Sequence, residues 1–433
     1  MGKKYTTDKI FMENGSLNIN SSHDGSDLTV LSISSSGQTT FVGNVGIGTT
    51  SPDYKLSVVG KISLNDGGQS VFVGHSAGAN DDATANVNVG IGFMTLLNNI
   101  SGFRNTAIGS YSMKNSTTAS YNTSVGSSSL ESLSTGGANT SVGYQAGYRN
   151  TTASNNVVVG AYAFSNNQTG NSNTAIGRNA MIANISGGSN VAIGQQALNS
   201  ATSSNNTAVG YQASYRNTTA SYNTAVGYQS SYTNTTGSLN SSFGHYALRY
   251  NTTGSDITAI GRAALYNNTT GVDNTAIGYH SGFNLRTGSN NAFLGHTANP
   301  STNTISNEIT LGNSAITALR CNVQTISSLS DLRDKKEIKN LKNAESFIKE
   351  LRPVSFTWNQ RDGGRVDTKD IGFIAQELLE AQVKANHKIP NLVLENNPDK
   401  LEAAYAAMLP SVVSALQSAL IKIEQLEQKI NNL

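Results

Sequence analysis

The clearest pattern in the chain is an apolar residue that recurs every 17 positions, each time directly before a glycine. Fourteen such glycines run from Gly92 to Gly312, and one interval of 16 is the exception among them. The segments between the motifs are rich in Asn, Thr and Ser, which favour turns over helix interiors. We therefore predict a mostly β structure of stacked 17-residue repeats, a β-roll or β-solenoid, over residues 66–315.

The repeat also predicts how one unit fits the next. A 17-residue unit has too little apolar surface to form a core alone, so identical side chains of stacked units should align into ladders. The repeat glycine fits a backbone position that needs positive φ or the close approach of a neighbouring strand. With one strand per unit at a spacing of about 4.8 Å, fourteen units would form a rod of roughly 65 Å.

Tyrosine recurs at the same interval, as at Tyr211 and Tyr228 directly after the repeat glycine and at Tyr215 and Tyr232 four positions later. Two interpretations stay open: these rings form stacked ladders that stabilise the rod, or they form a surface that holds a glycan. The six histidines are scattered and no paired carboxylates stand out in the repeats. We therefore expect no metal site, no cofactor and no glycosidase site.

The chain ends in a second periodic pattern, which has helical spacing. Its apolar positions are separated by 4, 3, 4 and 3 residues and then continue to the C-terminus with one irregular step; they are Leu409, Val413, Leu416, Leu420, Ile423, Leu426, Ile430 and Leu433. Such an a/d seam predicts a long helix that packs on its own domain or forms a coiled coil between chains. We favour the coiled coil, because it would hold three copies together and set the register of the rod.

Charge divides the chain near Ser330. Residues 330–433 contain 15 basic and 15 acidic residues, against 14 and 12 in residues 1–329, which marks a domain boundary. The net charge of +2 is spread without a basic block, so nucleic acid is not an expected partner. The single cysteine, Cys321, allows no intrachain disulfide. No stretch reads as a secretory signal or a membrane span, so we expect synthesis in a cytoplasm and no membrane insertion.

Four regions follow from these patterns. They are an N-terminal β-rich attachment or connector region (1–65), the repeat shaft (66–315), a neck (316–329) and a C-terminal domain (330–433). The segment 45–60 is similar to connectors that precede repetitive shafts in bacteriophage tail fibres. The Asn-Thr-Ala-Ile-Gly units resemble the head repeats of trimeric autotransporter adhesins, which form β-rolls in homotrimers.

The C-terminal region carries a more specific resemblance. The segments 330–338 (SDLRDKKEI), 351–358 (LRPVSFTW) and 371–377 (IGFIAQE), followed by Tyr405 and a terminal helix, resemble the intramolecular chaperone domain of endosialidases and phage tail fibres, the S74 peptidase family. The resemblance implies a small α+β domain that cleaves the chain between Leu329 and Ser330. In it Ser330 is the nucleophile and Lys335 the general base.

A lysine amine can act as a base if burial or a nearby cation lowers its pKa, and Arg333 and Lys336 could supply that cation. A physical reason connects such a cleavage to the shaft. Near-identical repeats can slip by one unit at little cost, so a trimeric nucleus at the C-terminus would fix the register before the shaft forms. Removing the nucleus afterwards would leave the shaft held by a kinetic barrier as well as by its contacts.

The sequence therefore favours a homotrimeric phage tail fibre or related receptor-binding fibre, made in the host cytoplasm and located in the virion. Its expected partners are a host cell-surface glycan or other receptor, and other virion tail proteins. It would be an enzyme only in the sense of one self-cleavage. A glycan-degrading tailspike is an alternative that turnover of capsule or lipopolysaccharide would reveal. A bacterial surface adhesin with the same maturation domain is another, which a leader or membrane anchor would support.

Overall fold

The computed structural model describes residues 45–47, 56–58, 69–82, 84–320, 330–361 and 365–432. The chain divides into two compact units, Met1–Leu64 and Asn65–Leu433. In the first unit, the described backbone is a parallel pair of short strands, β1 (Val45–Ile47) and β2 (Leu56–Val58).

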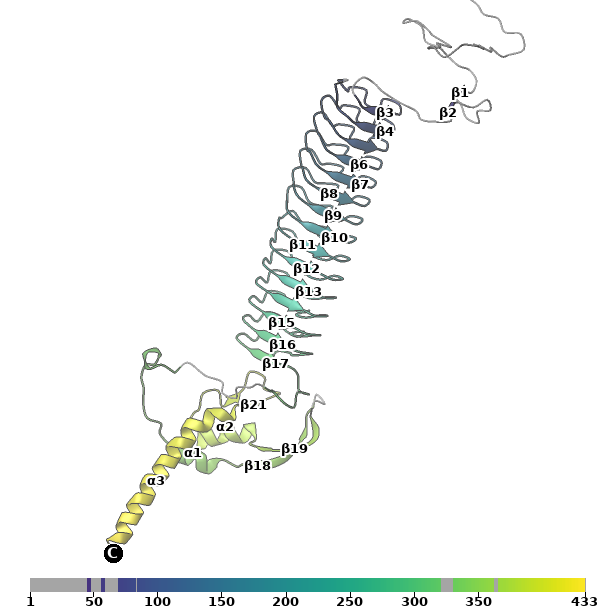
Figure 1. The fold of residues 1–433 in the computed structure, drawn as a ribbon. Coiled ribbons are helices and arrows are strands. Elements are labelled where there is room, and N and C mark those ends of the chain that lie inside the picture. The colour runs from purple at the N-terminus through teal and green to yellow at the C-terminus, as the bar shows by residue number, and fades with distance from the viewer. Residues whose placement is uncertain are drawn as a thin grey trace, which may run out of the picture. The chain divides into compact units, whose positions relative to one another are not determined.

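The second unit begins with a β-solenoid whose coils each contribute one three-residue strand to a parallel sheet of 15 strands (Figure 1). Consecutive strands pair with each other in order, so each coil contacts only its neighbours along the chain. The strands are β3 (Val71–Val73), β4 (Val89–Ile91), β5 (Thr106–Ile108), β6 (Thr123–Val125), β7 (Thr140–Val142), β8 (Val157–Val159), β9 (Thr174–Ile176), β10 (Val191–Ile193), β11 (Thr207–Val209), β12 (Thr224–Val226), β13 (Ser241–Phe243), β14 (Thr258–Ile260), β15 (Thr275–Ile277), β16 (Ala292–Leu294) and β17 (Ile309–Leu311).

This architecture confirms the predicted stacked β-repeats. The sheet also contains a coil that the repeat count missed, because Gly74 after β3 lies 18 residues before Gly92. The single 16-residue interval causes no break in the sheet: Val191 of β10 still pairs with Thr207 of β11. The turns between β10 and β11 are therefore one residue shorter, while the strand pairing is unchanged.

Small side chains from the middle of each strand fill the inside of the coils. From β4 to β16 the middle residue is buried, and it is most often alanine or serine, as at Ala192, Ala208 and Ala225. These residues pack against larger side chains such as Leu198, which the same coils supply from their turns. The apolar core thus runs along the solenoid as three clusters, each shared by several successive coils.

A ladder of buried asparagines runs beside this core, at the position just before the strand. The Asn139 side chain donates to Asn122 Oδ1 (3.0 Å) and to the Ala153 carbonyl (2.9 Å), while its own oxygen accepts from the Asn156 backbone N–H (3.0 Å). Each amide therefore satisfies its neighbours inside a low-dielectric interior, where an unmade hydrogen bond is costly. In the structure these asparagines link one coil to the next.

The repeat glycines occupy the backbone conformation that the sequence predicted. Gly227 has φ +133°, and a Cβ added to it would lie 2.5 Å from the carbonyl oxygen of Gly244 in the next coil. Both the positive φ and the close backbone approach exclude a side chain at this position.

The apolar residue before each repeat glycine does not lie in the core. It points outward from the sheet, and in eleven of the fifteen strands it is between 37% and 49% exposed. We call this column the outer ladder; its members are Val73, Ile91, Ile108, Val125, Val142, Val159, Ile176, Ile193, Val209, Val226, Phe243, Ile260, Ile277, Leu294 and Leu311. Alternation along a strand places neighbouring residues on opposite faces, so the buried middle residue forces its neighbours outward.

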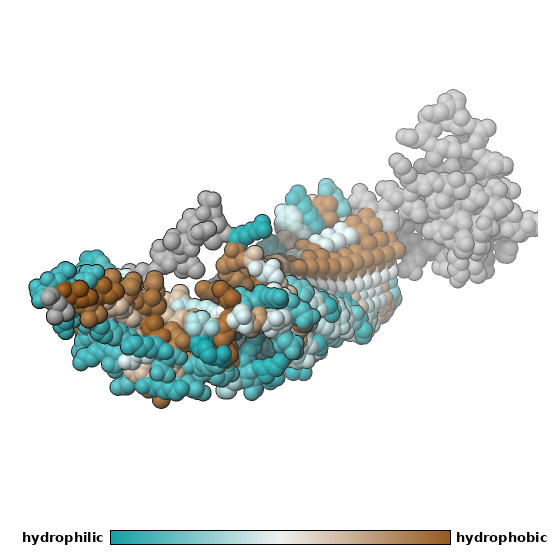
Figure 2. Space-filling view, turned by 90° about the horizontal axis from the view of Figure 1, so that it is seen from below, coloured by the Kyte–Doolittle hydropathy of each residue, from teal (hydrophilic) through white to brown (hydrophobic). Residues whose placement is uncertain are grey.

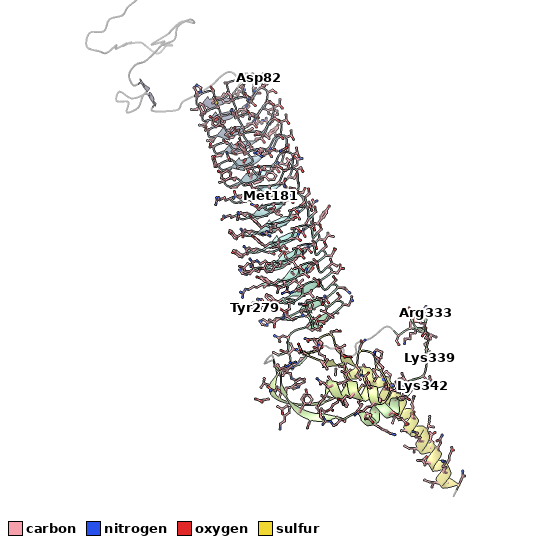
Figure 3. The ribbon with its side chains drawn as sticks, turned by 180° about the vertical axis from the view of Figure 1, so that it is seen from behind. Asp82, Met181, Tyr279, Arg333, Lys339 and Lys342 are labelled. Atoms are coloured by element: carbon pink, nitrogen blue, oxygen red, sulfur yellow. The ribbon has the colours of Figure 1, made fainter. Side chains whose placement is uncertain are left out.

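Tyrosines stack between coils, as the ladder interpretation predicted. The rings of Tyr211 and Tyr228 lie 5.3 Å apart at 15°, and those of Tyr215 and Tyr232 lie 5.2 Å apart at 8°. The column of Tyr211 and Tyr228 continues with His245, which stacks on Tyr228. Further along at the same position of the repeat, Tyr279 stacks on His296 (Figure 3, where Tyr279 is labelled).

The region after the solenoid is a small α+β domain. Its elements are the short 3₁₀ helix η2 (Leu332–Asp334), α1 (Ala344–Glu350), β18 (Val354–Asn359), β19 (Val366–Gly372), α2 (Ala375–Lys384), β20 (Val393–Leu394), β21 (Glu402–Ala403), η3 (Tyr405–Met408) and α3 (Leu409–Asn431). The strands form two antiparallel pairs, β18–β19 and β20–β21. Phe347 of α1, Leu378 of α2, Leu392 and Met408 form the core of this domain.

Helix α3 confirms the predicted long terminal helix, but most of its apolar side chains are exposed. Leu416 is 58% exposed and Ile430 is 67% exposed, and Ser411 is the one buried residue of the helix. The segment Tyr405–Asn431 is long and apolar enough to cross a membrane, which corrects the sequence-based expectation that no stretch is. A single such helix is weak evidence for a membrane span, and the heptad spacing is typical of a helix that packs on other helices.

Candidate functional site

The two residues predicted to carry the self-cleavage lie in direct contact. Lys335 Nζ donates a hydrogen bond to Ser330 Oγ over 2.6 Å. The turn η2 makes this contact, because Lys335, the residue that follows it, donates its backbone N–H to the Leu332 carbonyl (3.2 Å) and so lies back towards Ser330. Asp331 caps the start of the turn by accepting the Arg333 backbone N–H (2.8 Å).

Arg333 does not serve as a cation beside the lysine. Its guanidinium is paired with the Asp331 carboxylate, with Nη2 2.6 Å from Oδ2 (Figure 3 labels Arg333). The hydrogen bonds between them raise the pKa of Arg333 and lower the pKa of Asp331. Much of the charge that we expected to act on Lys335 is therefore neutralised within the turn.

The Ser330–Lys335 pair has the contact that base catalysis needs but lacks burial. Both residues are exposed in the single chain. A lysine acts as a base only in its neutral form, and removal from water is the main way to favour that form. Leu329, which would supply the acyl side of the cleaved bond, lies outside the described residues. The catalytic roles of Ser330 and Lys335 stay predictions.

Two of the sequence features that carried the family resemblance, the segment 371–377 and Tyr405, are in direct contact. The Tyr405 hydroxyl accepts the Phe373 backbone N–H (3.1 Å) and donates to the Phe373 carbonyl (3.0 Å). The preceding residue is Gly372, where an added Cβ would lie 2.8 Å from the same hydroxyl oxygen. The glycine in the segment 371–377 is therefore explained by the close packing of a tyrosine 33 residues further along the chain.

Two ion pairs link elements of this domain, one of them between the helices α1 and α3. Arg352, just before β18, donates through Nε to Glu377 of α2 (3.0 Å), and Lys422 of α3 donates to Glu345 of α1 (2.8 Å). These hydrogen bonds lower the pKa of Glu377 and of Glu345.

A buried histidine, which sequence reasoning did not single out, holds the start of α3. His387 is bonded through Nε2 to Ser411 Oγ (2.8 Å) and through Nδ1 to the Lys342 carbonyl (2.7 Å). No local pattern in the sequence pairs residues 24 positions apart, so this contact could be found only in the folded chain.

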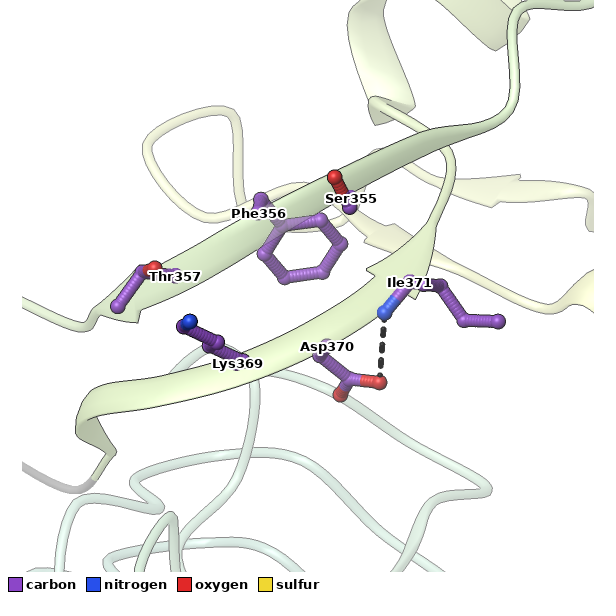
Figure 4. A pocket seen from close by; sticks show the side chains of 6 residues that line it. All are labelled: Ser355, Phe356, Thr357, Lys369, Asp370 and Ile371. Atoms are coloured by element: carbon purple, nitrogen blue, oxygen red, sulfur yellow. Dashed lines mark hydrogen bonds between the residues drawn. The ribbon is translucent and has the colours of Figure 1, made fainter.

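A shallow hollow of about 450 Å³ lies on the β18–β19 pair (Figure 4). Phe356, Lys369 and Asp370 are among the residues that line it. Asp370 accepts hydrogen bonds from the Trp358 indole (3.0 Å) and from Arg365 (3.2 Å), and the indole bond is the main cause of its lowered pKa. Neither Ser330 nor Lys335 lines this hollow, so it is a separate surface feature of the domain.

Among the residues that the structure describes, no group of three or more His, Cys, Asp and Glu side chains could hold a metal ion. His23 and Cys321 lie outside that part of the chain.

Comparison with known proteins agrees with the resemblance at the C-terminus. Residues 330–394 match the family model described as chaperone of endosialidase, Peptidase_S74. No curated protein and no solved structure matches the chain. The matched segment begins at Ser330 and ends in β20. The protein therefore combines a β-solenoid of about 14 turns with a chaperone-of-endosialidase domain, and the match covers that domain alone.

Proposed function

We propose that this chain is one subunit of a homotrimeric receptor-binding fibre, of the kind found in phage tails. In this proposal the C-terminal domain assembles three chains, sets the register of the solenoid and then cuts the chain between Leu329 and Ser330. The observation that carries the proposal is the match of residues 330–394 to the family described as chaperone of endosialidase. Two exposed apolar surfaces and the Ser330–Lys335 contact support it.

The first exposed surface is the seam of α3, made of Leu409, Val413, Leu416, Leu420, Ile423, Leu426 and Ile430. Each of these side chains is at least 45% exposed. Their 4–3 spacing places them on one face of the helix, where the same face of another copy can interlock with them. A coiled coil of three chains would remove this apolar surface from water.

The second surface is the outer ladder of the solenoid. Because all fifteen strands are in register, its side chains form one continuous apolar band along the sheet (Figure 2). Monomeric proteins seldom expose apolar patches larger than a few hundred Å². The three-residue strands contain no charged side chain, so a second and a third copy can pack against this face at no cost of buried charge.

The proposed cleavage can be written with balanced atoms. Neutral Lys335 takes the proton of the Ser330 hydroxyl, whose oxygen attacks the Leu329 carbonyl carbon. The bond to the Ser330 nitrogen breaks, and that nitrogen leaves as an amine after taking a proton. Water then hydrolyses the resulting ester and gives a Leu329 carboxylate and a free Ser330 hydroxyl. Because both side chains are exposed in one chain, we infer that a neighbouring chain covers them and so makes cleavage depend on assembly.

The test is intact-mass analysis of the purified protein under denaturing conditions, with the native oligomer measured by light scattering. We expect a trimer and fragments 1–329 and 330–433 for the natural sequence. Ser330→Ala and Lys335→Met should stay whole yet remain trimeric, whereas Lys336→Gln, a matched change at the neighbouring lysine, should still cleave. An uncleaved natural chain, or a cleaved Ser330→Ala variant, would exclude the proposed mechanism. A monomeric native protein would exclude the fibre.

A further inference from the structure

A groove runs along the solenoid over the coils that begin with β11 to β15. Its volume is about 430 Å³, and it is lined by Arg216, Thr235, Tyr250, Thr252, Asn267 and Arg286 among others. Asn267 and Arg286 also line a neighbouring hollow of about 310 Å³ in the following coils. Neither the repeat motif nor the family match assigns a role to these residues.

Two arginines set the electrostatic character of this groove. Arg216 belongs to the coil of β11 and Arg286 to the coil of β15, four steps of about 4.8 Å apart, or roughly 19 Å. Both are exposed, and within the described residues neither guanidinium is paired with a carboxylate. Residues 84–320 contain nine basic and four acidic side chains, which adds to the positive field. The groove therefore favours an extended ligand that carries negative charge.

Tyr250 gives the groove a flat apolar surface between the arginines. Its ring is 41% exposed and lies 5.0 Å from the ring of Tyr266, edge to face. Arg249 lies 5.3 Å from the Tyr250 ring and donates to the Tyr266 hydroxyl (3.2 Å). These contacts fix the orientation of the tyrosine before any ligand binds, which lowers the entropic cost of binding.

The remaining lining groups can accept hydrogen bonds. The Thr235 hydroxyl donates to the Thr252 carbonyl (2.9 Å), and the Thr252 hydroxyl donates to the Thr269 carbonyl (3.0 Å). Asn267 donates through Nδ2 to the Phe283 carbonyl (2.9 Å). Since each of these threonine hydroxyls donates its proton within the solenoid, the threonine oxygens and the Asn267 Oδ1 remain as acceptors for ligand hydroxyl groups.

We propose that this groove binds an oligosaccharide that carries carboxylate groups. The arginine forks match carboxylates, which they can hold through two parallel hydrogen bonds. The threonine and asparagine oxygens accept from sugar hydroxyls, and the Tyr250 ring packs on the apolar face of a sugar ring. A single exposed ring among polar groups fits a sugar chain better than a single-stranded nucleic acid, which needs a row of stacking rings.

The groove stays accessible when the outer ladder is covered. Thr252 lies nine residues after the outer-ladder residue Phe243 in a coil of 17, so it is about half a coil away from that face. This proposal rests on the proposed function in one respect, because it assigns the receptor class of the proposed fibre. Binding and assembly can nevertheless be measured separately.

The test uses the full-length protein, with its cleavage and oligomeric state determined first. The probes are oligosaccharides of several sugar acids, each paired with its carboxyl-reduced counterpart, and a single-stranded oligonucleotide; binding is measured by calorimetry. We expect binding of at least one acidic oligosaccharide and no binding of its reduced form. The double variant Arg216→Gln/Arg286→Gln should weaken binding about a hundredfold, roughly tenfold for each lost charged contact, and Tyr250→Ala should weaken it as well.

Arg149→Gln is the matched control. Arg149 lies six residues after its repeat glycine, as Arg216 does, and it is exposed, but it does not line the groove. Equal loss in this control, equal binding of reduced sugars, binding of the oligonucleotide alone, or no binding of any sugar acid would each overturn the proposal. A cleaved trimer that fails to bind would overturn the groove assignment alone. A monomer that still binds through Arg216 and Arg286 would overturn the proposed fibre alone.

Discussion

The solenoid and the C-terminal domain differ in how much of their apolar surface is covered within a single chain. In the solenoid, each coil closes its interior with buried alanines, serines and paired asparagines, and the outer ladder forms a regular column among its exposed apolar residues. In the C-terminal domain, the 23-residue helix α3 buries Ser411 alone and exposes its apolar seam. One region fills its interior within a single chain, whereas the other has its longest element almost uncovered.

We relate this difference to two properties of the proposed fibre, the stability of its shaft and the alignment of its chains. Within one chain the order of the coils is fixed by their covalent connections, but two chains packed along their outer ladders could shift by one coil and keep nearly all their contacts, so the repeats do not specify the alignment between chains. The 16-residue interval between Gly194 and Gly210 is one local mark of register. The C-terminal domain has no repeats, so its elements have no equivalent position to which they could shift. We infer that the non-repetitive part supplies the alignment that the repetitive part lacks.

The largest expected effect comes from a charge in the α3 seam. Leu416→Asp should abolish assembly and, with it, cleavage before Ser330, because three carboxylates would face one another in an apolar interface. Gln425→Asp, on the opposite face of the same helix, is the control and should remain trimeric and cleaved. Light scattering measures the assembly of both variants, and intact mass measures their cleavage. A trimeric, cleaved Leu416→Asp protein would contradict the proposed coiled coil.

The next effect is expected at a repeat glycine. Gly227→Ala would place a methyl group 2.5 Å from the Gly244 carbonyl oxygen at φ +133°, so we expect a loss of about 3 kcal/mol or more in the stability of the shaft. In Gly147→Ala the added methyl meets mainly the Leu130 side chain, at φ +58°, and the loss should be nearer to about 1 kcal/mol. Thermal denaturation of the cleaved shaft compares the two. Equal losses would mean that the close approach of the coils is unimportant.

A smaller effect should distinguish the inner and outer sides of one strand. Ala259 is fully buried and Ile260 is 39% exposed. Ala259→Leu overpacks the coil and should cost about 1–3 kcal/mol in any oligomeric state. Ile260→Ser should leave a single coil stack intact and weaken only the packing between chains. Denaturation measured over a range of protein concentrations separates these effects, and the reverse order of sensitivity would contradict the proposed interface.

The smallest effect is the response to acid. The pKa values of Glu345, Asp370 and Glu377 are lowered by hydrogen bonds from Lys422, Trp358 and Arg352. The unfolded chain then binds protons more readily, so the stability that these groups add is present above about pH 4.5 and is lost as pH falls through their lowered pKa values. Residues 84–320 contain four carboxylates, so the shaft should respond less. Circular dichroism of the two fragments between pH 7 and pH 3 would test this, and a shaft that unfolds first would contradict it.

Much of the molecule could be predicted from periodicity alone. The 17-residue interval gave the stacked strands, and the glycine in each repeat gave a position of positive φ, because a regular sequence must repeat its backbone geometry. The 4–3 spacing from Leu409 onwards gave helix α3. The family resemblance gave Ser330 and Lys335, and the turn at Leu332–Asp334 shows how residues five apart come into contact.

Other features could not be read from the sequence. An apolar residue before each glycine fits either face of a strand, and only the folded coil shows that the small middle residue is the inner one. Likewise, the recurrence of an asparagine before most strands does not show that stacking buries it and links it to the next coil. The arginine groove joins residues from coils up to 70 positions apart, as Arg216 and Arg286 are.

The sequence by itself determined the repeat and the helix, because these depend on local spacing, whereas the candidate nucleophile came from the family resemblance and stays a prediction. The tertiary structure decided which apolar column is covered, how the asparagines are satisfied, and which distant side chains share a groove. Those outcomes depend on how one coil or element lies against another, and that arrangement is fixed by packing and by the need to pair every buried polar group.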